Sequence, residues 1–415
     1  MNYTKTEERL IDAMENMEIV DAHEHLPPES VRTCSKVDVM TLFCHYTRTD
    51  LVAAGMNPQD YDRAIDPNSP LDERWKMFEP YFEHIRYASY TRPAFMAAKE
   101  FYGFDDINNS NYKELSERMQ SRNTPGIYHR ILRDKCKILV ALTQAGRTDY
   151  NDGLLVPLMP LDTYAGVWKV EDVSSRSDQL GMKVSSLEDY MQLAKKGIEK
   201  WKSEGAVGLK IAARPNIQPS QKIAEDMFKK LMAGENPRAN VNQGDHLTDF
   251  LWNYLMDVAG ELGMVVAVHA GMWGDFRQLD SKNMITVFPR HPNTKFDLYH
   301  LGMPSVCDTI VIGKNNANVW LNLCWCHIIS QQMACSGLDE CMDMVPLNKI
   351  IGFGGDYGRP VEKVYGHLVM AREDIATVLG RRVDRGQMGV DDAINIAKKL
   401  LRDNPEKLYK LNTKK

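Results

Sequence analysis

No run of apolar residues in this 415-residue sequence approaches the length of about 18 that a membrane-spanning helix needs. The first 20 residues, MNYTKTEERLIDAMENMEIV, are charged and lack the apolar centre of a secretory signal peptide. Their pattern favours an amphipathic helix that leads into a strand. We therefore expect a protein that does not bind a membrane and that resides in the cytoplasm.

Concentrated charge and patterned cysteines are also absent. The net charge is only −5, and no block rich in Lys and Arg suggests a nucleic-acid partner. The eight cysteines are irregularly spaced in a long chain, which does not indicate a disulfide framework. No G-x-G-x-x-G or Walker A pattern follows an apolar run, which lowers the case for nucleotide binding. The composition, 43% hydrophobic, allows a substantial core.

Eight short apolar runs are present, and amphipathic segments such as 187–205 and 247–263 separate many of them. The runs cover residues 17–25, 136–144, 153–162, 206–214, 263–271, 295–304, 318–326 and 349–358. Continuous apolar strands that alternate with helices predict an α/β protein with a parallel sheet covered by helices. Eight units fit a (β/α)8 TIM barrel better than an open sheet. We predict one barrel domain over residues 1–415.

One segment, about residues 36–130, interrupts this alternation. It is rich in helix formers and aromatics, as in LDERWKMFEPYFEHIRYASYTRPAFMAAKEFYG, and has no clear strand. We interpret it as a helical insertion after strand 1. An insertion at that point would lie over the C-terminal mouth of the barrel, where it could act as a lid. The segment 391–411 is expected to form a closing helix followed by a short terminal one.

Polar side chains gather at the predicted strand ends, where barrels of this type carry their active sites. In EIVDAHEHL, residues 18–26, His23 and His25 are two apart, so a strand directs both imidazoles to one side. Two such imidazoles make half of a metal site, although two solvated histidines at a strand end would look the same. Further polar residues at or near strand ends are Lys210, Arg214, His269, His300, Trp325, His327 and Asp356. The other histidines, for which we expect surface or packing roles, are His45, His84, His129, His246, His291 and His367.

The D-A-H-E-H motif of strand 1, the histidines that end strands 5 and 6 and the aspartate after strand 8 together resemble the amidohydrolase superfamily. The resemblance runs from residue 17 to about residue 411. HPNTKFDLYHLGMP and DNPEKLYKL are most similar to the branch that includes aminocarboxymuconate semialdehyde decarboxylase. The insertion and the strand-7 sequence NLCWCH are similar to uronate isomerase.

This resemblance implies one divalent metal ion, with His23, His25, His269 and Asp356 as its ligands. Zn²⁺ is the default for imidazoles with one carboxylate, and Mn²⁺, Fe²⁺ or Ni²⁺ are alternatives. Members like uronate isomerase use fewer strand ligands, and in that case His269 would not be one. Asp356 would also handle the proton of the metal-bound water.

Roles for the remaining candidates stay open at the level of the sequence. His300 is expected to act as an acid or base or to polarise the substrate, or else to be a buried packing residue. Lys210 could be carboxylated and bridge two metal ions, but we favour a single ion, with Lys210 or Arg214 contacting an anionic substrate. We also assign Trp325, His327 and Arg359 to the substrate pocket, since arginine pairs well with a carboxylate.

These assignments predict a metal-dependent hydrolase that uses an activated water on a C–O or C–N bond of a small carboxylate-bearing substrate, such as a lactone or an amide. A decarboxylase or a uronate-isomerase-like enzyme would use the same residues, because reaction type follows the loops of a fold. A non-catalytic binding protein on the same barrel is a further alternative. We expect a small anionic molecule as the partner, no nucleic acid, and room for a homo-oligomer.

Overall fold

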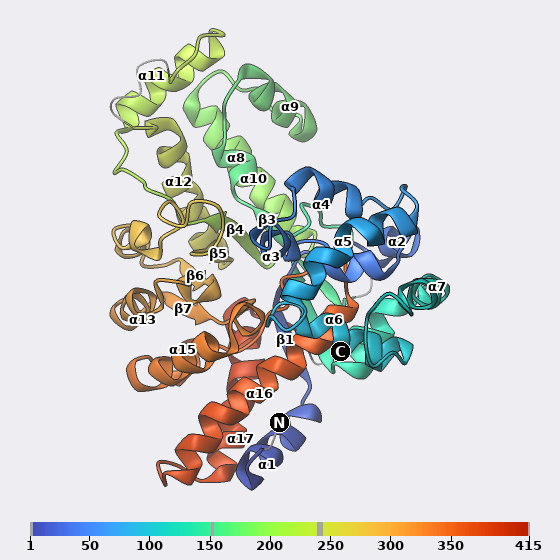
Figure 1. Ribbon diagram of the computed structural model, residues 1–415. Coiled ribbons are helices and arrows are strands. Elements are labelled where there is room, and N and C mark those ends of the chain that lie inside the picture. Colours follow the sequence, from blue (N-terminus) through green and yellow to red (C-terminus); the bar gives the residue numbers. More distant parts are fainter. Residues whose placement is uncertain (1–2, 151–152, 239–243, 414–415) are drawn as a thin grey trace.

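The computed structural model describes residues 3–150, 153–238 and 244–413, and its centre is a barrel of eight parallel strands (Figure 1). Each strand pairs with the next one in the chain, in the order β1 to β8. The strands are β1 (Ile19–Glu24), β2 (Ile138–Thr143), β3 (Leu155–Pro160), β4 (Gly208–Ala212), β5 (Val265–His269), β6 (Lys295–Leu298), β7 (Val319–Asn322) and β8 (Ile350–Ile351). All eight lie within the predicted apolar runs, which confirms the (β/α)8 barrel.

The segment after β8 joins the sheet back to β1. The backbone N–H of Ala22 donates to the carbonyl of Phe353 at 3.2 Å, and the N–H of Asp356 donates to the carbonyl of His23 at 2.8 Å. β8 itself has only two residues, because the glycine-rich sequence that follows leaves the strand conformation. The ring is thereby closed at the point where the D-A-H-E-H motif ends.

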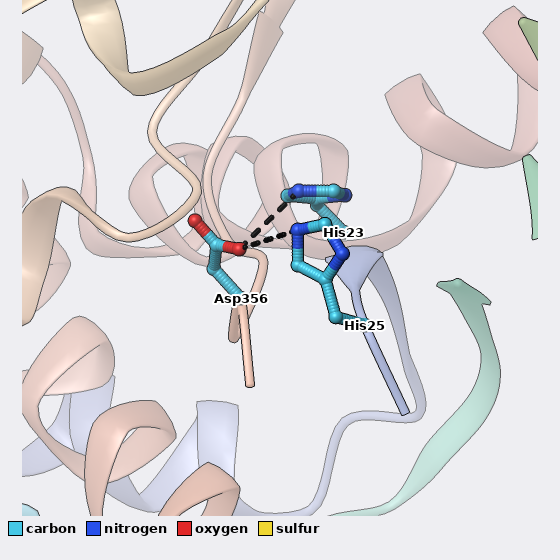
Figure 2. A group of neighbouring side chains, drawn as sticks. All are labelled: His23, His25 and Asp356. Atoms are coloured by element: carbon cyan, nitrogen blue, oxygen red, sulfur yellow. Dashed lines mark ion pairs between the residues drawn. The ribbon is translucent and has the colours of Figure 1, made fainter. Parts of the chain in front are cut away.

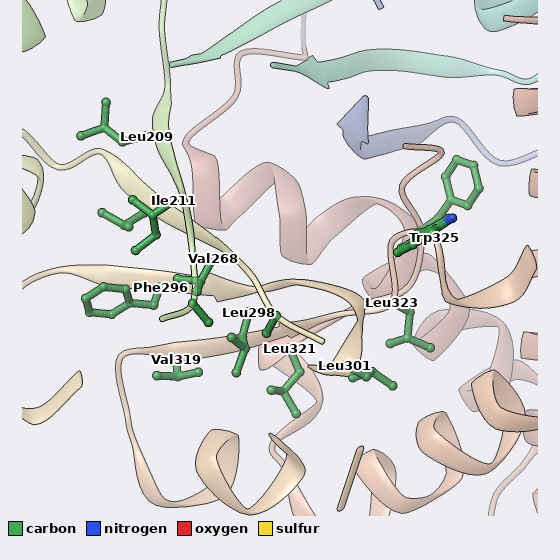
Figure 3. Packing of buried hydrophobic residues seen from close by; sticks show 14 of the residues in the cluster. Leu209, Ile211, Val268, Phe296, Leu298, Leu301, Val319, Leu321, Leu323 and Trp325 are labelled. Carbon is green, nitrogen blue, oxygen red and sulfur yellow. The ribbon is translucent and has the colours of Figure 1, made fainter. Parts of the chain in front are cut away.

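Most strand residues are buried because apolar side chains cover both faces of the sheet. In β5, the first four of the residues VVAVH are buried, as expected of a parallel strand between a barrel interior and a layer of helices. Figure 3 shows side chains such as Leu209, Phe296, Val319 and Leu321, all fully buried, packed in this layer.

Helices surround the barrel and supply its outer layer (Figure 1). After α1 (Lys5–Glu15), which lies against α16 and α17, they are α8 (Asp162–Ala165), α9 (Val170–Leu180), α10 (Leu187–Ser203), α11 (Gln221–Met232), α12 (His246–Leu262), α13 (Val306–Asn315), α14 (Cys326–Ile329), α15 (Gln331–Met344), α16 (Glu362–Asp384), α17 (Val390–Lys398) and α18 (Asn404–Tyr409). Short helical turns are η5 (Ser281–Met284), η6 (Phe288–Arg290), η7 (Tyr299–Gly302), η8 (Leu347–Lys349) and η9 (Lys399–Asp403). Within the described ranges, no helix is both long enough and apolar enough to cross a membrane.

Helix ends follow local sequence signals. α10 begins with a capping box in which the Ser186 hydroxyl accepts from the N–H of Asp189. α12 ends at Gly263, which has a φ of 65°, a conformation that glycine adopts without steric cost. The predicted helices 187–205 and 247–263 are confirmed to within two residues of these bounds.

The predicted insertion is helical throughout and begins slightly earlier than expected. It contains α2 (Glu29–Thr33), η1 (Val39–Phe43), α3 (Thr47–Ala53), α4 (Pro58–Ala64), α5 (Leu71–Ile85), α6 (Arg92–Ala97), η2 (Ala98–Tyr102), α7 (Tyr112–Arg122) and η3 (His129–Lys135). It has a hydrophobic core of its own, in which the rings of Phe43 and Phe82 lie 4.9 Å apart. The single-domain span 1–415 stays a prediction, and its residues 1–2, 151–152, 239–243 and 414–415 lie outside the described residues.

Candidate active site

Three side chains from opposite ends of the sequence meet at the C-terminal mouth of the barrel (Figure 2). His23 is the fifth residue of β1, His25 directly follows that strand, and Asp356 lies in the loop after β8. Oδ1 of Asp356 is 3.4 Å from Nε2 of His23 and 3.1 Å from Nε2 of His25. The ligand atoms of the three residues all lie within 4.8 Å of one another. Such a cluster can hold a metal ion.

The backbone places these side chains through close contacts between β1 and the loop after β8. The N–H of His25 donates to the carbonyl of Tyr357 at 3.0 Å. At Gly354, a Cβ atom would lie 2.9 Å from the backbone nitrogen of His23, and at Gly355 it would collide with Oε1 of Glu24. Only glycine allows the loop to come this near. The G-G-D sequence therefore brings the aspartate onto the strand that carries the histidines.

The protonation states suit a divalent cation. Burial alone would raise the pKa of Asp356, but His23 and His25 beside it lower the pKa well below its usual value. Burial, together with Lys210, lowers the pKa of His23. Nδ1 of His25 lies 2.8 Å from the carbonyl oxygen of Gln144 and must donate to it, so Nε2, 3.1 Å from Oδ1 of Asp356, is the ring nitrogen available to a metal ion. Imidazole nitrogens together with one ionised carboxylate are the donor set that zinc and related ions take.

The predicted fourth ligand, His269, lies at the end of β5 beside His300 and is not part of this three-residue cluster. Nδ1 of His300 is 2.9 Å from the carbonyl oxygen of Cys324 and therefore carries the proton. Nε2 of His300 must then accept from Nδ1 of His269 at 3.0 Å. Nε2 of His269 is left without a proton, buried, and without a partner among the described residues.

Lys210, on β4, reaches the centre from the barrel wall. Its ammonium nitrogen is 3.1 Å from Nε2 of His23 and 4.0 Å from the centre of the Tyr299 ring. Burial lowers its pKa to about 8, so most of the amine remains charged at neutral pH. The strand-4 lysine is thus brought to the site, as the sequence predicts.

Three of the predicted substrate-binding residues lie elsewhere, which corrects their assignment. His327 is fully buried in α14, where Nδ1 contacts Asp374 at 2.8 Å and Nε2 contacts the carbonyl of Gly352 at 2.9 Å. Arg214 is hydrogen-bonded to Asp249 and covers the ring of Trp252. Arg359 is exposed and lines a separate cavity under the insertion.

Trp325 does lie near the centre, and the insertion adds two residues that the sequence did not single out. The hydroxyl of Tyr46 is 3.4 Å from Oδ1 of Asp356, and the ring of Tyr46 is 4.3 Å from that of Trp325. The ring centre of His45, a residue expected to have a surface or packing role, lies 3.6 Å from that of Tyr46, with the two rings tilted by 42°, and burial lowers the pKa of His45 to about 4. The only available signal was the His-Tyr pair within a segment predicted to cover the mouth.

A cavity of about 510 Å³ adjoins the cluster, within the range of ligand pockets in enzymes. Its wall includes His25, Lys210 and His269 from the barrel, and His45 and Tyr46 from the insertion. The cavity therefore lies between the strand ends and the insertion, and its polar groups come from both.

A family model described as Amidohydrolase matches residues 167–411, more than half of the sequence. The chain belongs to the amidohydrolase family. This amidohydrolase is accordingly an enzyme of a metal-dependent superfamily built on the TIM barrel, as the D-A-H-E-H motif suggested. No curated protein matches it.

Solved structures share the fold of this amidohydrolase at low sequence identity. A uronate isomerase from Thermotoga maritima is 18% identical with a TM-score of 0.80, and the match covers 98% of both chains. A glucuronate isomerase from Caulobacter crescentus is 16% identical with a TM-score of 0.76, covering 98% of this chain and 94% of the other. A putative metal-dependent hydrolase from Lactobacillus casei is 13% identical with a TM-score of 0.64, covering 97% of each. These matches establish a shared architecture, insertion included.

Proposed function

We propose that this protein is a hydrolase that uses one divalent metal ion, Zn²⁺ by default, to cleave a C–O or C–N bond of a small carboxylate-bearing substrate such as a lactone or an amide. The observation that carries the proposal is the convergence of His23, His25 and Asp356 beside a cavity that also exposes Lys210 and His269. An ion held by these three side chains would supply a Lewis acid and lower the pKa of a water molecule.

Asp356 is placed to handle the proton of the attacking water. Its Oδ1 faces the two ligand histidines, while Oδ2 is buried without a hydrogen-bond partner among the described residues and lies 3.8 Å from Nε2 of His300. The water oxygen bonds to the carbonyl carbon and the bond to the leaving oxygen or nitrogen breaks. The proton taken up by Asp356 passes to that leaving atom.

Lys210 would bind the carboxylate of the substrate, since its ammonium group lines the cavity and the predicted arginines lie elsewhere. His269 and His300 act as a pair in this proposal. His300 does not line the cavity, but it orients His269, which does, through the 3.0 Å contact between their rings. The unprotonated Nε2 of His269 can accept a hydrogen bond or a proton from the substrate, so the acid-base role predicted for His300 is exercised through His269.

A second candidate is proton transfer without hydrolysis, as in an isomerase. It is favoured by Tyr46, whose hydroxyl stands 3.4 Å from Oδ1 of Asp356, and by the full-length likeness to two uronate isomerases. A phenol beside a carboxylate can relay a proton between neighbouring carbon and oxygen atoms of a sugar acid. Decarboxylation would use the same residues. The binding-protein alternative is set aside, because the chain belongs to an enzyme family and keeps the cluster intact.

The test is a panel of substrates offered to the metal-loaded enzyme, with three readouts: acid release from lactones and amides, CO₂ release from carboxylates, and aldose-to-ketose conversion of uronates. We expect acid release, reduced by roughly 10²- to 10⁴-fold in Asp356→Asn and unchanged in Asp105→Asn, a control at an exposed aspartate. Tyr46→Phe should leave hydrolysis nearly intact. Ketose formation that is lost in Tyr46→Phe, without acid release from any substrate, would overturn the hydrolase in favour of the isomerase.

We also propose that the protein resides in the cytoplasm and that its partner is a small anionic molecule. Whether identical chains associate is to be measured.

A further inference from the structure

A second cavity of about 550 Å³, which we call the second chamber, adjoins the cavity beside His23, His25 and Asp356. The two share His45, Tyr46 and Trp273 as walls. The two chambers are therefore immediate neighbours. The position of the second chamber, between the insertion and the loops after β5 and β7, makes it a place for a part of the substrate away from the reacting bond.

Six of the twelve residues that line the second chamber, counting His45, carry aromatic rings. Tyr46 is central, with its ring 4.3 Å from Trp325, 5.0 Å from Trp273 and 6.1 Å from Tyr90. The rings of Trp273 and Tyr90 stand nearly perpendicular to Tyr46, at 84° and 85°. Faces and edges are both presented to the space between them, and an aromatic guest gains from each kind of contact.

Two polar groups in these walls, the hydroxyl of Tyr90 and the indole N–H of Trp325, lie beside each other, in side chains that are 7% and 4% exposed. Neither has a further hydrogen-bond partner among the described residues. Burial raises the pKa of Tyr90 well above its usual value, so the phenol keeps its proton. With the indole N–H directed at the phenol oxygen, the O–H of Tyr90 remains to be satisfied, and a guest that brings an oxygen acceptor would satisfy it.

The chamber offers little to a charged guest. Arg48 is the one cation among the described residues that line it, and it is paired with Asp62 at 3.6 Å. Asp50, the one carboxylate there, has its pKa raised by burial. A carboxylate would find no cation other than this paired arginine.

The rim is apolar as well. Met272, Trp273 and Phe276, in the loop after β5, are 37%, 53% and 51% exposed, and all three line the chamber. Single exposed apolar residues are common, but a group of them beside a cavity marks a binding site.

We propose that the substrate carries an uncharged aromatic ring with an oxygen acceptor. The ring occupies this second chamber while the reacting bond lies beside His23, His25 and Asp356. The inference rests on the proposed function and narrows its substrate class to aryl esters, aryl-fused lactones or aryl amides.

The test uses phenol and cyclohexanol, a pair that differs in aromaticity and carries no carboxylate, titrated into the full-length protein and followed by NMR. Phenol should bind roughly five-fold more tightly than cyclohexanol because of the ring contacts. Tyr90→Phe, which keeps the ring and removes the donor, should weaken phenol binding by about three- to ten-fold. Tyr87→Phe, at a tyrosine that is 93% exposed, is the control. Trp273→Ala should also weaken binding, whereas Trp168→Ala, at a tryptophan 62% exposed, should not.

Equal binding of the two probes, or unchanged phenol binding in Tyr90→Phe, would overturn the inference. A His23→Ala, His25→Ala double variant separates this outcome from the fate of the proposed function. Phenol should still bind to this variant, because the residues that line the second chamber do not include His23, His25 or Asp356. Inactivity of the wild-type enzyme on every substrate, with phenol binding retained, would count against the hydrolase and leave the aromatic chamber supported.

Discussion

Single side chains at the centre of the barrel are held by hydrogen bonds that decide their protonation. The carbonyls of Gln144 and Cys324 each fix a proton on Nδ1 of a neighbouring histidine, His25 and His300 respectively. Nε2 of His25 then faces Asp356, and Nε2 of His300 faces Nδ1 of His269. The orientation of the candidate metal ligand His25 and of His300 therefore depends on backbone carbonyls.

A buried carboxyl below the site gives a pH-dependent stability that can be measured. Asp297 is fully buried in β6, accepts from Tyr409 at 2.7 Å and Asn322 at 2.9 Å, and burial raises its pKa to about 7. Between about pH 4 and pH 7 the folded protein therefore holds a proton that the unfolded chain releases. Stability contributed by this group is present at pH 4 and is lost as the pH rises through 7, at up to about 1.4 kcal/mol per pH unit.

We predict that Asp297→Asn flattens this slope and raises the free energy of unfolding at pH 8, because the amide keeps both hydrogen bonds without becoming charged. Urea unfolding of the wild type and the variant at several values between pH 5 and pH 8 measures it. Asp105→Asn, at an exposed aspartate, should leave the slope as it is. Parallel pH profiles for wild type and Asp297→Asn would refute the assignment.

Residues on strands could be predicted from the sequence because a strand directs alternate side chains to one face. That rule placed His23 and Lys210. It failed for His327, because β7 ends at Asn322 and the chain turns into α14, which points the imidazole toward α16. The rule also could not identify His45 and Tyr46 as site residues, because their position depends on the tertiary fold of the insertion.

At the scale of elements, the candidate metal site depends most on the loop between β8 and α16. β8 is two residues long, and the following glycines let the loop pass close to β1 before Asp356, which has a φ of 63°. The eight strands and several helices were predictable from apolar runs and capping residues. The early end of β8 was not, because its sequence continues apolar through Phe353, whereas the strand itself ends at Ile351 and Phe353 is joined to β1 through the hydrogen bond from Ala22.

Gly355→Ala should disturb this loop. The added methyl group would collide with Oε1 of the buried Glu24, whose Oε2 accepts from the N–H of Tyr357 at 2.6 Å. Relief of the collision must move the loop that carries Asp356. We expect metal affinity to fall by roughly 10- to 100-fold and the free energy of unfolding by about 1–3 kcal/mol, measured by metal titration and urea unfolding.

Gly358→Ala is the matched control in the same loop, since a methyl group there would lie 3.8 Å from the nearest atom, Cβ of His25. It should change metal affinity little. If the two variants behave alike, close approach at Gly355 is not what positions Asp356.

At the scale of the whole molecule, two hydrophobic cores meet at one cavity. The barrel and its helices form the larger core, and the insertion forms a second one around residues such as Phe78 and Phe82. The cavity beside His23, His25 and Asp356 is lined by residues of both parts. Sequence pattern could predict the barrel and the helical insertion separately, but their relative placement, and hence the shape of the pocket, depends on contacts between residues far apart in the chain.

The central claim, a single metal ion held by His23, His25 and Asp356, is tested most directly by the metal content of protein purified without chelators. We predict one divalent ion per chain in the wild type, none in a His23→Ala, His25→Ala double variant, and one in His84→Ala, His129→Ala, a control at two exposed histidines. Absence of metal from the wild type, or its retention in the first double variant, would contradict the claim. Two ions per chain would contradict the single-ion centre and assign Lys210 to a bridge between them.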